Sequence, residues 1–493
     1  MAEWPYWKLL ASAIFHLFFG LSAYYHIDSM NQLQPYVESL ANKSIYDHYS
    51  VYLSPNSMTW VWSSAAACSA IGSITGALLM KFPLSKFGTR NTVMILKSSL
   101  QILASFIQFL AFPTNCIELM FVGRLVSGAA IIVAMAIPVF LTECAPVKYR
   151  GFVATIAYLG SPFWTIIGAT IGLPQVLGSP QTWNYVLILP AFTGLVHLLC
   201  CPIFPKSPKY LYITCGQTEA AKKSLRFYHG PNAELEPVFR EYDKEAALAQ
   251  RQQTAGWKEI MTRRYYRWPF FICIVANMAE VLGGSDLAMQ YSTGFFELLG
   301  IPLERSALFT VIFAKVPAFF AVLLGLSLVE HTGRRILMLT GVALGIVGTS
   351  LVFGAGLAPT GSSQSTGLGV AGLLLGATTA YIGPSFISYM MPGEICPQSS
   401  RALTSGIAFG CSWLPSVFFV LLYPPLQRYI GAYAILPLVL AGMLAFVFLF
   451  LYMPETKGKP VDEIVKRWIS EEQQLLIRSP SPDSYGSRES EIL

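Results

Sequence analysis

Twelve long apolar segments constrain this chain more than any other feature of its sequence. A helix that crosses a bilayer needs roughly 20 mostly apolar residues, and segments of that kind recur along most of the chain. Only 12% of the residues are charged, against about 25% in a soluble globular protein, so polar surface is too scarce to cover a water-soluble body. We expect an all-α membrane protein with spans at 9–30, 58–80, 92–112, 116–141, 152–174, 184–204, 269–298, 305–329, 336–357, 367–392, 402–424 and 430–452.

Basic residues in the loops predict the orientation. Cytoplasmic loops carry an excess of Lys and Arg, and such residues follow the second, fourth and eighth spans and fill the long segment 205–268, whereas the opposite loops hold few. Both termini are therefore predicted to be cytoplasmic. The sequon at Asn42 lies in the first loop on the other side and is a candidate glycosylation site in a glycoprotein.

Three short patterns occur twice, in the same order and at a nearly constant separation. The first copies begin at Gly88, Glu143 and Pro205, and the second copies begin at Gly333, Glu394 and Pro454. Each copy follows an even-numbered span, which indicates a duplicated six-helix unit. Repeats of this kind place a solute site near the midplane, between the two halves.

The repeat also predicts the domain boundaries. We expect six-helix bundles at 1–204 and 269–453, joined by a cytoplasmic linker at 205–268 and followed by a cytoplasmic, partly disordered tail at 454–493. Within the linker, Thr218–Tyr228 and Glu234–Gln252 are predicted to be amphipathic helices. In the tail, residues 471–476 resemble an acidic dileucine sorting signal. A plasma membrane location is favoured, and an endosomal or lysosomal membrane remains open.

Charged residues at the cytoplasmic ends of the spans are candidates for a gate. They are predicted to form ion pairs between helices, and individually weak pairs suit a latch that opens in each cycle. The alternative is that the basic residues only follow the positive-inside rule. The eight candidates are Arg90, Glu143, Arg150, Glu330, Arg334, Arg335, Glu394 and Arg401.

The same motifs carry a resemblance to a known family. They are Gly88–Arg90, Gly123-Arg124, Glu143–Gly151, Pro205–Leu211, Glu330–Arg335, Glu394–Arg401 and Pro454–Gly458. Together they resemble the signature set of the sugar porter branch of the major facilitator superfamily, which includes the animal facilitative glucose transporters. The resemblance covers roughly residues 10–470 and implies two six-helix bundles and alternating access without ATP. It implies no cofactor, metal or nucleic acid, and the sequence contains no motif of an enzyme.

The positions that contact sugar in that family differ in this chain. Its span-seven glutamines are replaced by Glu280 and Val281, and its asparagine is replaced by Asp286. Amides suit sugar hydroxyls because they both donate and accept hydrogen bonds, and these substitutions remove them. Gly283-Gly284 beside them either breaks the helix or allows close packing. The pocket candidates are Tyr158, Glu280, Gly284, Asp286, Gln290, Tyr291, Tyr389, Ser412 and Trp413, with packing as the alternative for each aromatic residue.

Ionisable residues at membrane depth are costly and mark candidate functional positions. Glu280 and Lys315 lie at similar depths in neighbouring spans and are predicted to form an ion pair, with either a structural role or a role in solute or proton binding. His26 and Arg124 also lie at one depth, and His26 is either a hydrogen-bonding residue or a proton carrier. Asp28 is expected to be hydrated near the outer boundary.

We therefore expect a carrier of a small polar solute, a monosaccharide or related polyol, that works as a monomer. Two alternatives remain. The first is a proton-coupled or facilitated carrier of a different, charged solute, favoured by the acidic substitutions. The second is a sensor on the same fold that binds its ligand without transporting it.

Overall fold

The computed structural model describes residues 6–251, 255–459 and 461–468, and these residues form helices joined by short loops. The first half of the chain folds into α1 (Trp7–Phe15), α2 (Tyr25–Tyr49), α3 (Pro55–Leu79), α4 (Lys81–Asn91), α5 (Lys97–Leu110), α6 (Ile117–Ala134), α7 (Ile137–Cys144), α8 (Arg150–Ile171) and α9 (Trp183–Leu199). The middle segment folds into α10 (Thr218–His229), α11 (Glu236–Arg251) and α12 (Trp257–Thr262).

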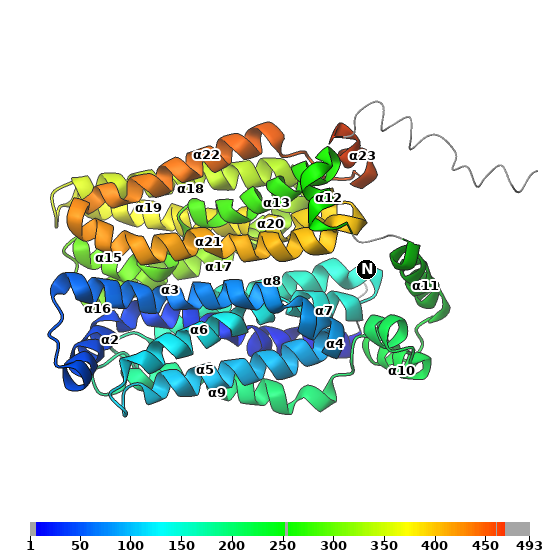
Figure 1. Cartoon of the computed structure of the whole chain (residues 1–493), viewed down its shortest axis with the longest axis horizontal. Coiled ribbons are helices and arrows are strands. Elements are labelled where there is room, and N and C mark those ends of the chain that lie inside the picture. Colours follow the sequence, from blue (N-terminus) through cyan, green and yellow to red (C-terminus); the bar gives the residue numbers. More distant parts are fainter. Residues whose placement is uncertain (1–5, 252–254, 460, 469–493) are drawn as a thin grey trace, which may run out of the picture.

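The second half of the chain repeats this plan with more interruptions. It folds into α13 (Arg264–Leu282), α14 (Ser285–Gln290), α15 (Ser292–Leu298), α16 (Leu303–Thr310), α17 (Val316–Thr332), α18 (Arg334–Leu357), α19 (Ser363–Ile382), α20 (Pro384–Ile395), α21 (Gln398–Ile430), α22 (Leu436–Tyr452) and α23 (Val461–Val465). The two halves lie side by side as two bundles with roughly parallel long axes (Figure 1).

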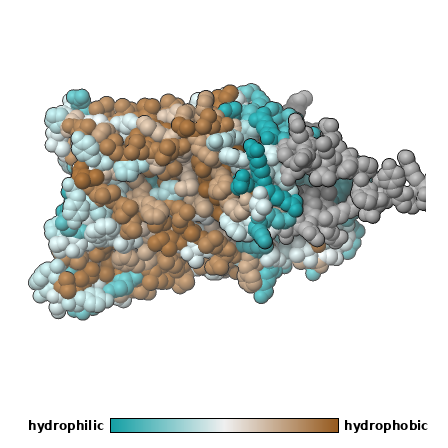
Figure 2. All heavy atoms as spheres, turned by 45° about the horizontal axis from the view of Figure 1, so that its top comes forward, coloured by the Kyte–Doolittle hydropathy of each residue, from teal (hydrophilic) through white to brown (hydrophobic). Residues whose placement is uncertain are grey.

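One end of the molecule carries the helices of the linker and of the tail. The helices α10, α11, α12 and α23 lie together there, beside α4 and the start of α1 (Figure 1). We call it the basic end, because it holds the loops rich in Lys and Arg. The other end is called the opposite end. Apolar residues form a band between the two ends, and hydrophilic residues gather at both, most densely at the basic end (Figure 2).

Ten helical segments of the described chain are long and apolar enough to cross a membrane. The last of them, 399–452, contains both α21 and α22 and so covers two of the predicted spans. The predicted span 269–298 is not among the ten, because it is broken into α13, α14 and α15. Counting the broken helix and dividing the long segment gives the twelve predicted spans.

The first helix is longer than predicted. The polar stretch 31–57 was expected to be a loop, but α2 continues to Tyr49. Within that stretch Leu33, Val37 and Leu40 are buried at helical spacing, so an apolar stripe persists among the polar residues. The prediction was based on mean hydropathy, which the polar residues of this stretch lower, and so the helix was predicted to end too early.

The seventh span is broken at its double glycine, which decides between the two predicted roles. Gly284 has φ of +91° and lies between α13 and α14. A Cβ atom at this position would lie 2.1 Å from the side chain of Thr349. Only glycine fits this conformation and this close approach.

The two amphipathic helices of the linker form where they were predicted, as α10 and α11, whereas the short α12 was not predicted. Leu225 of α10 and Phe239 of α11 belong to one small apolar cluster at the basic end. The predicted tail is described only as far as Trp468, without residue 460, so the sorting-signal candidate at 471–476 lies outside the described residues.

Candidate functional site

A central cavity of about 220 Å³ lies between the two halves. The first half lines it with residues of α2, α7 and α8, and the second half with residues of α13, α14, α17, α19, α20 and α21. Pockets for drug-sized ligands typically measure about 300–1,000 Å³. The smaller volume suits a small solute. Because both halves line the cavity, the contacts of a bound solute change when the halves move relative to each other.

Seven of the nine pocket candidates line this cavity. They are Tyr158, Glu280, Asp286, Gln290, Tyr389, Ser412 and Trp413. Gly284 is not among the lining residues, but the break that it permits separates Glu280 on α13 from Asp286 on α14. Tyr291 lines a different hollow, described below.

The two acidic residues of the cavity have hydrogen-bonding partners on other helices. The carboxylate of Glu280 interacts with Ser385, and the carboxylate of Asp286 interacts with Ser416 and Gln290. Asp286 is only 7% exposed, and its Oδ2 atom has no hydrogen-bond partner. Asp286 thus lines the cavity with a carboxylate of which one oxygen is buried and unpaired in this state.

Several other polar groups of the cavity were not predicted. Tyr158, Ser161 and Thr165 follow one another at helical spacing on α8, so the last two share the face of the predicted residue. Ser385 follows Gly383-Pro384, where the tenth span breaks between α19 and α20. Such a dipeptide is a known break signal, and it could have identified this position.

A second hollow of about 420 Å³ lies nearer the opposite end, and we call it the outer hollow. Both halves line it, with residues that include Glu38, Trp62, Glu297 and Arg428. The indole Nε1 of Trp62 is buried without a hydrogen-bond partner.

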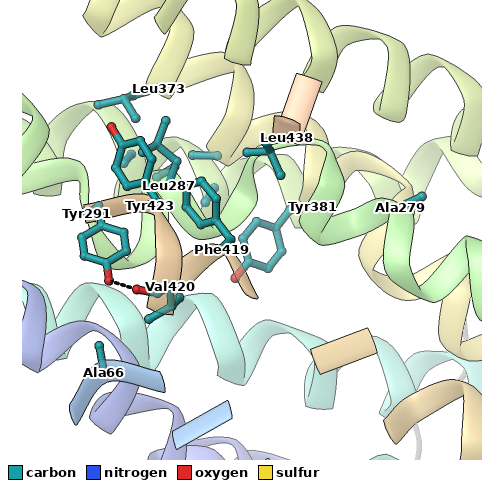
Figure 3. Close-up of a cluster of buried hydrophobic side chains, with 14 of the residues drawn as sticks. Ala66, Ala279, Leu287, Tyr291, Leu373, Tyr381, Phe419, Val420, Tyr423 and Leu438 are labelled. Carbon is teal, nitrogen blue, oxygen red and sulfur yellow. Dashed lines mark hydrogen bonds between the residues drawn. The ribbon is translucent and has the colours of Figure 1, made fainter. Parts of the chain in front are cut away.

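A cluster of aromatic rings separates the outer hollow from the central cavity. Tyr291 and Tyr423 line the outer hollow, while Tyr381 lines the central cavity. The hydroxyl of Tyr291 donates a 2.6 Å hydrogen bond to the carbonyl oxygen of Val420 (Figure 3). Phe419 stacks on Tyr423 with ring centroids 4.8 Å apart.

The predicted ion pair between Glu280 and Lys315 is wrong. The ammonium of Lys315 donates to Asp28 of the first half, and it also donates to the carbonyl oxygens of Ala288 and Met289, at 3.2 and 2.9 Å. Asp28 is completely buried, so its expected hydration is also wrong. The prediction matched depth, but depth does not determine which way a side chain points. Lys315 ends a π-helical turn that changes this direction.

His26 and Arg124 are in contact, but through the backbone of one of them. The guanidinium of Arg124 donates to the carbonyl oxygen of His26, while the imidazole Nε2 of His26 lies 3.3 Å from the hydroxyl of Ser105. Both residues are buried within the first half. Neither lines the central cavity or the outer hollow.

The gate candidates bond mainly to their own half of the molecule. Arg334 pairs with Glu394 at 3.3 Å, and Arg150 pairs with Glu241 of the linker at 3.0 Å. Glu143 accepts from Thr89 and Ser207. Backbone carbonyl oxygens of Phe204, Phe450 and Cys396 accept from the remaining arginines, Arg90, Arg335 and Arg401, respectively. The side chain of Glu330 lies outside the described part of the chain.

Asn42, the glycosylation candidate, is exposed at the opposite end. It belongs to α2 and not to a loop. The hydroxyl of Ser44, the third residue of the sequon, is buried and accepts a 3.0 Å hydrogen bond from the backbone N–H of Ile117.

Comparisons with known proteins agree with this architecture. A family model described as "Sugar (and other) transporter" matches residues 12–468. The human protein named "Solute carrier family 2, facilitated glucose transporter member 9" is 27% identical over 446 residues, which cover 89% of this chain and 81% of that protein. Mouse facilitated glucose transporter member 7 is 24% identical, over 89% of this chain and 86% of its own length.

Solved structures with the same fold include the xylose transporter XylE from E. coli. Its inward open conformation matches with a TM-score of 0.72 and 18% identity, over 94% of this chain and 99% of that chain. The structure of XylE, a proton:xylose symporter of the major facilitator superfamily, bound to 6-bromo-6-deoxy-D-glucose matches with a TM-score of 0.70 and 19% identity, over 94% of this chain and 98% of that chain. This chain therefore has the fold of that superfamily.

Proposed function

We propose that this chain, which belongs to the sugar (and other) transporter family, carries a small polar solute across a membrane by alternating access. The observation that carries the proposal is the central cavity, which lies between the two halves and is lined by polar groups from both. A site in this position opens to one side or the other when the halves rock against each other.

The solute class that we propose is a monosaccharide or a related polyol. The names of these relatives support it, since both are called facilitated glucose transporters. The hydroxyl-rich lining also supports it. The hydroxyls of Thr165 and Ser285 donate to backbone carbonyl oxygens and keep lone pairs that can accept from a hydroxylated solute.

The present state is proposed to be closed toward the opposite end. Asn31 of the first half donates to Ser292 of the second at 3.0 Å, and Arg428 donates to Thr59 at 2.7 Å. Both contacts lie on the far side of the cavity from the basic end, and both must break when the cavity opens there. One chain encloses the whole cavity, so the functional unit is proposed to be a monomer.

The basic end is proposed to face the cytoplasm, because its loops hold most of the Lys and Arg residues. We further propose that the chain resides in the plasma membrane. Fluorescence microscopy of the tagged full chain, together with antibody access to a tag on either end in intact and permeabilised cells, tests both statements.

The transport proposal is tested with the purified full chain in proteoliposomes. We expect saturable uptake of labelled D-glucose or of a related polyol that stops at equal concentrations and is faster when the vesicles are preloaded with unlabelled solute. Protein-free liposomes are the control. Binding of solutes without any uptake would replace this proposal with the sensor. Accumulation that requires a proton gradient would replace simple facilitation with proton coupling.

A further inference from the structure

We propose that the transported solute carries a positive charge, a protonated amine that Glu280 and Asp286 hold in the central cavity. The inference rests on the proposed transport function and narrows the solute to a small hydroxylated amine. It is carried by the charges, aromatic rings and acceptors around the two hollows.

The cavity contains acidic residues without basic ones. Glu280 and Asp286 line it, and none of its described lining residues is Lys, Arg or His. A nearby base, Lys315, is bound to Asp28 and to two backbone carbonyl oxygens. Buried carboxylates require a partner, because removing them from water costs several kcal/mol each. A cationic solute supplies that partner only while it is bound.

Asp286 provides a specific acceptor for such a group. Its Oδ2 atom is buried without a hydrogen-bond partner, although Ser416 and Gln290 interact with the same carboxylate. An ammonium group has three N–H donors and no acceptor. One such group can therefore donate to the carboxylates of both Asp286 and Glu280, which a single sugar hydroxyl cannot do, because it has only one hydrogen to donate.

Aromatic rings complete the lining around the two acidic residues. Tyr24, Tyr158, Tyr381, Tyr389 and Trp413 all line the cavity. Ring faces attract cations, and the attraction is stronger in sites shielded from water. Sugar rings also stack on aromatic ring faces. The aromatic lining therefore fits a hydroxylated amine and favours its protonated form.

The outer hollow adds an independent observation. It is lined by the carboxylates of Glu38 and Glu297 and by one base, Arg428. That base already donates to Thr59 and to the carbonyl oxygen of Pro55. Acidic residues thus line both hollows along the route from the opposite end. The described lining of the outer hollow thus keeps a net negative charge, which concentrates cations and speeds their entry.

The experiment compares three probes that differ at one substituent. D-Glucosamine carries an ammonium group, D-glucose a hydroxyl at the same carbon, and N-acetyl-D-glucosamine a neutral amide. In proteoliposomes of the full chain, we expect D-glucosamine uptake to exceed uptake of both neutral sugars by about tenfold or more, as for a charge-assisted hydrogen bond. An inside-negative potassium diffusion potential should accelerate D-glucosamine uptake and leave D-glucose uptake unchanged.

Variants locate the effect in the cavity. In E280Q/D286N, the preference for D-glucosamine over D-glucose should fall by about tenfold, while an unchanged size-exclusion profile and unfolding temperature show that the variant is folded. If this variant does not fold, D286N alone provides the same comparison. The matched control is E118Q, which removes a carboxylate at the opposite end that lines neither hollow and accepts from Tyr49.

The outcomes separate this inference from the proposed function. Uptake of D-glucose that is equal to D-glucosamine uptake, or that is insensitive to excess D-glucosamine, overturns the inference and leaves transport intact. A preference that survives in E280Q/D286N also overturns it, since the acidic residues would not be responsible. If D-glucose uptake depends on a proton gradient and on these two carboxylates, the carboxylates bind protons and not an ammonium group, which also overturns the inference. No uptake of any solute overturns the proposed function itself.

Discussion

The basic ends of the two halves have the same backbone plan but different side-chain chemistry. Gly88 and Gly333 occupy equivalent places, with φ of +78° and +90°. In the first half, the carboxylate of Glu143 accepts from the hydroxyls of Thr89 and Ser207. In the second half, Glu394 pairs with Arg334 and accepts from Thr456. Duplication thus preserved the acceptor, the turn and one hydroxyl donor, while the other donor is the hydroxyl of Thr89 in the first half and the guanidinium of Arg334 in the second.

The charged residues at the basic end stabilise each half separately. The contacts of both glutamates remain within their own half, so they stiffen each half and do not tie the two halves to each other. The described ion pair that does join the halves is Asp28 with Lys315, and it is buried deep in the membrane region. Mutations can therefore weaken the stability of one half separately from the contact that joins the two halves.

The largest effect on stability is expected when only one member of the ion pair between Asp28 and Lys315 is replaced. Lys315→Met leaves Asp28 buried without a partner, and removing one member of a buried pair costs about 3–5 kcal/mol. Thermal unfolding of the purified protein in detergent should show this loss. Asp28→Asn/Lys315→Met should recover most of it, because both charges are then absent. A double variant as unstable as the single one would mean that the pair is not what stabilises this contact.

A smaller and asymmetric effect is expected at the basic ends. Glu394→Gln removes the charge that binds Arg334, and this should cost about 2 kcal/mol, as for a hydrogen bond to a charged group. Glu143→Gln keeps a side chain that still bonds to hydroxyls, so its loss should stay below about 1 kcal/mol. Thermal unfolding of the two variants side by side checks this. Equal losses would remove the proposed difference between the halves.

The architecture was largely predictable because its causes are local. Apolar length predicts the spans, basic loops predict which end they share, and the repeated motifs place equivalent turns in both halves. The break at Gly284 was one of two readings of a double glycine, and only the close approach of Thr349 decides between them. The long α2 was missed because its apolar stripe is hidden among polar residues.

The partners of the charged residues were less predictable. Depth along a span can be counted from the sequence, but rotation about the helix axis depends on turns such as the π-helical turn that ends at Lys315. Contact across the two halves also depends on how they pack, which no local pattern encodes. For this reason Lys315 was assigned to Glu280, in a neighbouring span, although its partner is Asp28, in the first span of the other half.

Another difference between the halves lies three residues after the last membrane segment of each. Glu455 accepts from the backbone N–H groups of Arg334 and Arg335, whereas the equivalent position in the first half is Lys206. Partial burial alone would raise the pKa of Glu455, but these and two further backbone N–H donors lower it overall. Its stabilising effect is therefore present above the usual carboxyl pKa and is lost as the pH falls through the lowered value.

Glu455→Gln should consequently destabilise the protein by about 1 kcal/mol near neutral pH, after allowance for solvent screening. Lys206→Gln should change the stability little and serves as the matched control. Unfolding temperatures of both variants at pH 7.5 and in mild acid test this. The Glu455→Gln deficit should shrink in acid, and a deficit that stays constant would show that charge is not involved.

The smallest effect concerns His229, which is half-buried against the basic end of the first half, whereas His331 at the basic end of the second half is exposed. His229 of α10 contacts the carbonyl oxygen of Cys144 at 3.1 Å. Burial lowers its pKa from 6.5 to about 4, and the nearby Arg150 acts in the same direction. In the unfolded chain the imidazole takes up a proton near its ordinary pKa, while in the folded protein it stays neutral. Stability is therefore fully present above pH 6.5 and is lost progressively as the pH falls toward 4.

Between pH 7.5 and 5.5 this group should cost the protein about 1 kcal/mol. His229→Gln should remove that part of the acid sensitivity, measured as the shift in unfolding temperature between the two pH values. The matched control is His331→Gln, at the exposed end of α17 in the second half, which should leave the shift unchanged. If both variants altered it equally, acid sensitivity would not distinguish the halves, and the comparison would rest on the glutamates and on Lys206.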